Sequence, residues 1–222
     1  MKNYNSYATV GSLDTRIRKT LTNTFISVGV MWLIVALASY LTVDTAMSFG
    51  TSIALLIGSF GCLFGIFLCR DNAFGLVLLA GFAGLEGLSL GPVLGHYLHL
   101  RGGTELVMQA ASLTGLATFG CAAYCVTTRK SFSHLGGFLF ASLFVLLGAM
   151  VLSIFVHSAM LNLGISVAAA VIFTIYLLYD ISNVVTGQET NYIIAALNVF
   201  LDMLNLFLHL LNILSVFNSN DD

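Results

Sequence analysis

The sequence predicts an all-α membrane protein, a bundle of seven transmembrane helices. The chain has 222 residues, of which 58% are hydrophobic and only 8% are charged, and this is more apolar than a soluble domain needs. Several apolar runs exceed the roughly 18 residues that mark a membrane-spanning helix. The formal net charge of −2 provides no basic surface, so we expect no nucleic-acid partner.

Charged and polar clusters divide the apolar runs into individual helices. We expect one compact transmembrane domain over residues 21–216, because the connections are short and no linker interrupts them. Residues 1–20 lack the short apolar core and cleavage site of a signal peptide and are predicted to be a polar tail, and residues 217–222 a short C-terminal tail. The seven helices are predicted at about 21–42, 47–68, 73–98, 105–127, 134–157, 162–184 and 192–216.

The basic residues predict the orientation of the bundle. If the N-terminus is cytoplasmic, only Arg101 lies on the opposite side. Short loops rich in lysine and arginine remain in the cytoplasm, so the N-terminus is predicted to be inside and the C-terminus outside. The residues on the cytoplasmic side are then Lys2, Arg16, Arg18, Lys19, Arg70, Arg129 and Lys130.

A polar stripe runs along the last predicted helix. At roughly 100° per residue, its six side chains fall within about 80° of one another. Such a stripe in an apolar helix indicates burial in a bundle, facing a water-filled or protonatable interior. Residues 190–222 contain no lysine or arginine, which argues against a helix lying on the membrane surface. The alternative is a set of interhelical hydrogen bonds. The stripe consists of Asn191, Asn198, Asp202, Asn205, His209 and Asn212.

Asp180, near the end of the sixth helix, is a potential partner for Asp202. The two helices are joined by residues 185–191, and at about 1.5 Å rise per residue the depths of the two aspartates differ by about 8 Å, which tilt reduces. Two adjacent carboxyls in a poorly hydrated place cannot both ionise cheaply, so we expect them to share a proton. Loss of that proton would push the helices apart, as in a pH latch. The alternative is that Asp180 is simply solvated at the membrane interface.

Glu86 places a carboxyl group in the third predicted helix. It lies on the side roughly opposite Gly84, Gly91 and Gly95, whose spacing favours close helix packing. A carboxyl at this depth must be protonated, paired or hydrated. We therefore retain Glu86 as a candidate pathway residue, with a purely structural role as the alternative.

Two motifs that suggest catalysis are better explained without it, and we predict no enzyme. Residues 87–91 match G-x-S-x-G, but that pattern requires a strand-to-helix turn, and His96 on the same helix cannot reach Ser89. Asp180 and Asp202 invite comparison with an intramembrane aspartyl protease. The residues before Asp202, however, are Val199, Phe200 and Leu201, not the G-x-G that resemblance to such proteases requires.

Several segments carry a resemblance to a known family. Residues 87–92, which end in Gly91-Pro92, and residues 200–211 resemble the Bax inhibitor-1 (transmembrane Bax inhibitor motif) family. Residues 127–137 and 187–192 are similar to its bacterial branch, the inner-membrane modulators of the protease FtsH. The resemblance covers nearly all seven helices and rests on the order and spacing of these segments together.

The resemblance implies a last helix surrounded by the other six, in a bacterial inner membrane with the C-terminus in the periplasm. It also implies a pH-sensitive calcium leak channel with a paired-aspartate latch at Asp180 and Asp202, and Arg70 bonding to that latch. The family leads us to expect an acidic residue in the middle of the second helix. Ser59 stands there instead, and Glu86 is the candidate substitute.

Two functions follow as expectations. In the first, deprotonation of the latch, with Arg70 changing partner, opens a path for Ca²⁺ or protons along the stripe. A hard cation needs several oxygen ligands, and Asp180, Asp202 and Glu86 are the candidate transient ligands. No resident cofactor is expected. In the second, the protein docks on FtsH through its helices and residues 1–24 and slows proteolysis.

Overall fold

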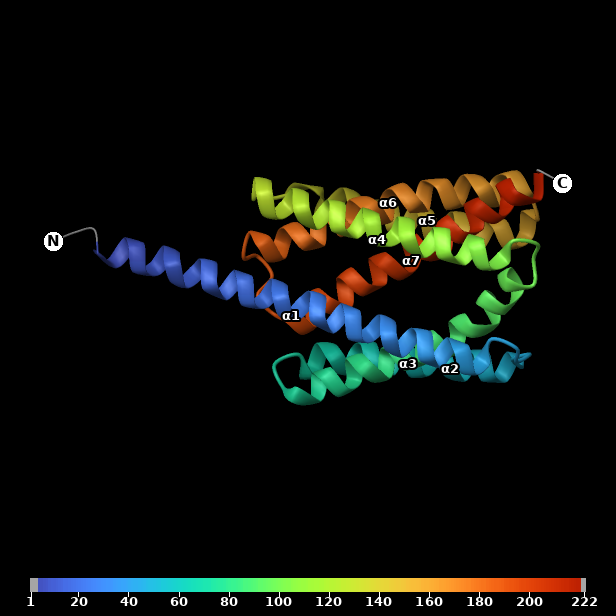
Figure 1. Cartoon of the computed structure of the whole chain (residues 1–222), viewed down its shortest axis with the longest axis horizontal. Coiled ribbons are helices and arrows are strands. Elements are labelled where there is room, and N and C mark those ends of the chain that lie inside the picture. Colours follow the sequence, from blue (N-terminus) through green and yellow to red (C-terminus); the bar gives the residue numbers. More distant parts are fainter. Residues whose placement is uncertain (1–3, 221–222) are drawn as a thin grey trace.

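Seven long α-helices account for most of the chain in the computed structural model, which describes residues 4–220 and the side chains of residues 14–218. All seven are long and apolar enough to cross a membrane, and no strand occurs within residues 4–220. The all-α prediction is therefore confirmed (Figure 1). The elements are α1 (Tyr4–Thr42), α2 (Phe49–Cys69), α3 (Ala73–Leu98), α4 (Gly103–Thr128), a 3₁₀ turn (Ser133–Leu135), α5 (Gly136–Val156), α6 (Ala159–Val185) and α7 (Tyr192–Asn220).

The predicted tails differ most from the structure. α1 begins at Tyr4 instead of near residue 21, and its first part runs past the neighbouring helices (Figure 1). A nucleated helix propagates through polar residues as well as apolar ones, so a polar sequence did not predict where α1 begins. Similarly, α7 continues to Asn220, and Asn218 Nδ2 donates to the carbonyl of Arg101 at 2.9 Å. Residues 1–3 and 221–222 of the predicted tails lie outside the described residues.

The helices form two layers with α7 between them. α1, α2 and α3 form one layer and α4, α5 and α6 the other, and α7 crosses obliquely from one side to the other (Figure 1). It packs against α1, α2, α3, α4 and α6 and is the most buried helix. The C-terminal helix is therefore central, as predicted. The structure differs from a last helix surrounded by all six others in one respect: no Cα atom of α5 comes within 8 Å of a Cα atom of α7.

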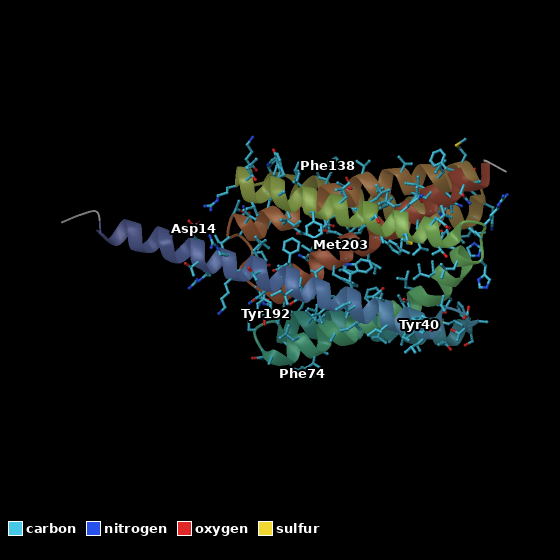
Figure 2. The ribbon with its side chains drawn as sticks, in the orientation of Figure 1. Asp14, Tyr40, Phe74, Phe138, Tyr192 and Met203 are labelled. Carbon is cyan, nitrogen blue, oxygen red and sulfur yellow. The ribbon has the colours of Figure 1, made fainter. Side chains whose placement is uncertain are left out.

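Apolar side chains cover both outer faces of this arrangement. Figure 2 shows Phe74 on one outer face and Phe138 on the opposite one, while Met203 of α7 lies between the layers. Both phenylalanines are exposed in the isolated chain. Such extensive apolar exposure suits a protein surrounded by lipid tails and would be costly in water.

Glycines let α1 and α3 approach closely along what we call the glycine seam, formed by Gly87, Gly91 and Gly95 of α3. A Cβ atom on these glycines would collide with the backbone carbonyl oxygens of Val35, Ser39 and Val43, respectively. Small residues at this spacing are the usual means of bringing membrane helices into backbone contact. The predicted packing role of the α3 glycines is therefore confirmed for Gly91 and Gly95.

Pro92 lies within this seam and creates a local defect that α1 repairs. Proline has no N–H, so the carbonyl of Leu88 loses its normal helical donor. The hydroxyl of Thr42 donates to that carbonyl at 3.0 Å. Because an unpaired carbonyl in a membrane is costly, this bond fixes the end of α1 against α3.

Aromatic packing fixes the apolar side of α7 against the first layer. The Trp32 ring lies 5.6 Å from Phe200 and 6.0 Å from Phe207, and Phe82 lies 6.2 Å from Phe200, measured between centroids. Asp202, on another side of α7, faces Asp180 of α6 in the second layer.

Candidate functional site

A cavity of about 650 Å³ separates α5 from α7. It occupies the region in which no Cα atom of α5 lies within 8 Å of one in α7, and Phe60 of α2 also lines it. The wall formed by α5 is entirely apolar, whereas the wall formed by α6 and α7 carries polar groups. We call this space the aspartate cavity. Its polar lining consists of Tyr176, Tyr179, Asp180, Asn198, Asp202 and Asn205.

Asp180 and Asp202 meet in this cavity. Their carboxyl groups lie close enough to interact directly, so helix geometry closes the depth difference expected from the sequence. Asp202 is 5% exposed and Asp180 partly buried. The Oδ2 atom of Asp202 is buried and has no hydrogen-bond partner. Burying an unpartnered carboxyl oxygen is costly, and such a group is a feature of functional sites more often than of stable cores.

The charged groups around the aspartates do not neutralise them. No lysine, arginine or histidine is among the residues that line the cavity. The nearest additional charge is that of Glu189, which acts on Asp180 and whose Oε1 accepts the backbone N–H of Asn191 at 2.7 Å. Tyr176 lies close enough to interact with both aspartates. Together these groups make the cavity a locally acidic site.

Arg70 does not join the aspartates in this conformation. Its Nε lies 3.8 Å from Asp71 Oδ2, its side chain is 55% exposed, and within the described side chains no ion pair links it to Asp180 or Asp202. The residue is nevertheless tied to the start of α7, because Asn191 Nδ2 donates to its carbonyl at 2.9 Å. The guanidinium therefore lies outside the cavity.

The polar stripe of α7 divides into three parts with different roles. Asn191 caps the helix: its Oδ1 accepts the N–H groups of Ile193 and Ile194 at 3.0 and 3.2 Å, the usual bonding of an asparagine N-cap. Asn198 and Asn205 line the aspartate cavity on the turns before and after Asp202. Asn205 Nδ2 donates to the carbonyl of Leu201 at 2.8 Å.

The remaining part of the stripe makes hydrogen bonds between helices. His209 stacks on Phe173, with centroids 6.1 Å apart, and its Nδ1 lies 3.4 Å from the hydroxyl of Ser166. That hydroxyl donates to Asn212 Oδ1 at 3.3 Å. Asn212 Nδ2 donates in turn to the phenol oxygen of Tyr97 at 3.5 Å. α7 is thereby joined to α6 and α3 by polar contacts of the kind expected between membrane helices.

Glu86 lies apart from the aspartate cavity. It lies close enough to Ser59 of α2 to interact with it and is absent from the cavity lining. Ser59 is buried, so these two polar groups meet at the interface between α2 and α3. The carboxyl of α3 thus reaches the position on α2 where the resemblance leads one to expect an acid.

The sequence did not identify Tyr176, Ser166 and Tyr97 as parts of these polar contacts. Tyr176 lies one helical turn before Asp180, a spacing that places both residues on the same helix face. This spacing could have predicted Tyr176 as a neighbour of the aspartates. No comparable signal marks Ser166 or Tyr97. Among the described side chains, no group of three or more histidines, cysteines or acids could hold a metal ion.

The chain resembles several bacterial membrane proteins. It is 36% identical over 204 residues to an uncharacterised membrane protein of Vibrio cholerae, covering 91% of this chain and 92% of the relative. It is 34% identical over 185 residues to an uncharacterised protein of Pseudomonas aeruginosa, covering 83% of each. A third relative is named modulator of FtsH protease YccA in Escherichia coli, with 36% identity over 151 residues and 68% of each chain covered.

A second Escherichia coli strain has the same degree of similarity in a protein named inner membrane protein YccA. The profile of the family described as inhibitor of apoptosis-promoting Bax1 matches residues 17–219, which include all of α2 to α6 and most of α1 and α7. Seven membrane-spanning helices, the extent of this match and the similarity to these relatives agree with one another. The chain is a membrane protein that belongs to the Bax inhibitor-1 family.

Proposed function

We propose that the protein is a pH-sensitive leak channel for Ca²⁺ in a bacterial inner membrane, with a cytoplasmic N-terminus and a periplasmic C-terminus. The observation that supports this function best is the contact of Asp180 with Asp202 in a cavity that no basic side chain lines. When a buried pair of acids has no counter-ion, ionising either one or both of them costs free energy. Its protonation is therefore coupled to the distance between α6 and α7.

The closed state is the one in which the aspartates share a proton. The shared hydrogen bond then holds α6 against α7. When that proton leaves, two negative charges repel each other in a poorly hydrated space. No Cα atom of α5 lies within 8 Å of one in α7, and the cavity provides room for the helices to separate.

The open state offers oxygen ligands to a passing cation. Ca²⁺ binds six to eight oxygen atoms in flexible geometry, which Asp180, Asp202 and the amide oxygens of Asn198 and Asn205 would supply in part, with water completing the shell. Glu86 lies outside this cavity and would act elsewhere along the path. Arg70, at the cytoplasmic end of α2, would bind the carboxylates after deprotonation. Passage beyond the cavity also requires the Ser166–Asn212 contact to break.

Ion flux in proteoliposomes at several pH values tests the channel. We expect Ca²⁺ flux to rise with pH in the native chain, and to lose most of this dependence in Asp180→Asn and Asp202→Asn. Glu105→Gln, which neutralises an acid in the first turn of α4, is the matched control and should behave like the native chain. Flux that never exceeds that of protein-free vesicles would reject the channel.

The second candidate function is modulation of FtsH, and the name of the Escherichia coli relative favours it. The N-terminal part of α1 is the surface proposed for docking, because it extends beyond the other helices (Figure 1). Removing residues 1–13 leaves Asp14–Thr42, a helix long and apolar enough to cross a membrane. We expect this deletion to weaken inhibition of FtsH on a membrane substrate. Unchanged inhibition would argue against docking through this segment.

A further inference from the structure

The aspartate cavity has one apolar wall and one acidic wall. Leu143, Leu147 and Met150 of α5 face it from one side, and Asp180 and Asp202 lie on the other. Its volume of about 650 Å³ falls in the usual range of small-molecule sites, about 300–1,000 Å³. A ligand complementary to both walls would have an apolar body and a cationic end.

The cavity opens sideways, toward the region that lipid occupies. No Cα atom of α5 lies within 8 Å of one in α2, considering the described residues. Phe60 of α2 and Leu147 of α5 line the cavity and are 54% and 48% exposed, whereas Asp202 is 5% exposed. A molecule dissolved in the bilayer would therefore meet apolar side chains first and the carboxyl groups last.

The acidic wall contains a buried oxygen that no side chain or backbone group pairs with. Asp202 Oδ2 is buried without a partner, and the lining contains no basic residue. An ammonium group carries both a positive charge and N–H donors, and a charge-assisted bond of this kind is among the stronger hydrogen bonds. The aromatic rings of Phe173 and Tyr176, which also line the cavity, add faces that attract a cation.

Other classes of ligand would match fewer features of the aspartate cavity. An acyl chain would fill the apolar part and leave Asp202 Oδ2 unpaired. A resident metal ion would leave the apolar wall unmatched, and no cluster of three or more acids, histidines or cysteines that could hold one occurs among the described side chains.

We propose that the aspartate cavity binds a hydrophobic organic ammonium ion, which enters from the bilayer between α2 and α5 and binds to Asp180 and Asp202 through its N–H groups. This site goes beyond the proposed channel and does not depend on it, because its occupancy is measured at equilibrium without ion flux.

Calorimetry of the full chain in lipid nanodiscs tests the site with 4-phenylbutylammonium as the probe. Titration of empty nanodiscs measures partition into lipid and is subtracted. We expect saturable binding to the native chain that weakens roughly thirtyfold or more in Asp180→Asn/Asp202→Asn, since the buried charge loses its partner. The neutral 4-phenylbutanol has a similar body and should also bind at least about tenfold more weakly, because it lacks the charge.

Two further variants separate the site from general effects on the fold. Leu147→Trp fills the opening while leaving both carboxyls in place, and should abolish saturable binding. Glu105→Gln removes an acid outside the cavity and should bind the amine as the native chain does. Circular dichroism and size-exclusion chromatography establish that each variant is folded.

The binding and flux measurements test the site and the channel separately. Absence of saturable binding, equal binding by the double variant, equal binding of the alcohol, or full binding by Leu147→Trp would each overturn the proposal. Amine binding without pH-dependent Ca²⁺ flux would reject the channel alone, and flux without amine binding would reject this site alone.

Discussion

The interface between α1 and α3 and the space between α5 and α7 are built in opposite ways. Along the glycine seam, backbone touches backbone, and even the carbonyl released by Pro92 finds a donor in Thr42. Between α5 and α7 there is a cavity, and a carboxyl oxygen of Asp202 has no partner. The comparison teaches that direct backbone contact closes the bundle along the seam. At the site proposed for function the bundle instead leaves a cavity beside a buried, unpartnered carboxyl oxygen.

Adding one methyl group to the glycine seam should cause the largest change in the free energy of unfolding. In Gly91→Ala the new Cβ meets the backbone of Ser39 and Thr42, so α1 and α3 must move apart. Overpacking of this kind costs about 2 to 3 kcal/mol, measured as the free energy of unfolding in mixed detergent micelles. Gly115→Ala is the control, because no atom lies within 4 Å of its added Cβ, and it should not be destabilised. Equal stability of both variants would contradict the rigid seam.

Replacing Asp202, the acid with an unpartnered oxygen, should increase the free energy of unfolding instead of lowering it. Asp202→Leu removes a buried oxygen that has no hydrogen-bond partner, and the penalty for such a group is about 1 to 3 kcal/mol. At a pH above that at which the proposed shared proton leaves, we therefore expect the unfolding free energy to increase by about 1 to 2 kcal/mol, together with the loss of pH-dependent flux. A loss of stability at that pH similar to that of Gly91→Ala would mean that the ionised pair stabilises the fold.

Removing the hydroxyl that repairs the Pro92 defect should have a smaller effect. Thr42→Val keeps the shape of the side chain but leaves the Leu88 carbonyl without its donor. Interhelical hydrogen bonds in membranes contribute about 1 kcal/mol, and the same unfolding measurement should detect this loss. Thr127→Val is the matched control, because that hydroxyl is exposed and bonds only to a carbonyl of its own helix. A cost in the control equal to that of Thr42→Val would contradict a specific role for this bond.

Enlarging a side chain at the cavity should have the smallest effect. Leu147→Phe adds atoms next to empty space, so we expect a change in unfolding free energy below about 0.5 kcal/mol. The same substitution at the fully buried Leu177 should cost about 1 to 3 kcal/mol, because no space is available there. Similar losses at both positions would show that the cavity is filled in the folded protein.

The sequence predicted those features that depend on periodicity and connection length. The bounds of α3 agree at both ends with the prediction. The contact of Asp180 with Asp202 was foreseeable, since the short connection between α6 and α7 fixes their relative depth. The three roles within the stripe were not, because they depend on where α7 begins and which side chains face it. Asn191, for example, acts as a cap only because α7 starts at Tyr192, and Asn212 depends on Ser166 and Tyr97 from distant segments.

The central position of α7 has a consequence for biosynthesis. This helix is made after the other six, yet most of the contacts between the two layers run through it. Until α7 inserts, the α1–α3 seam can form on its own, while the layer of α4, α5 and α6 has few surfaces through which to join it. The two layers therefore associate late, when a helix carrying five asparagines, an aspartate and a histidine enters between them. Its polar side chains must find their partners during that final step of assembly.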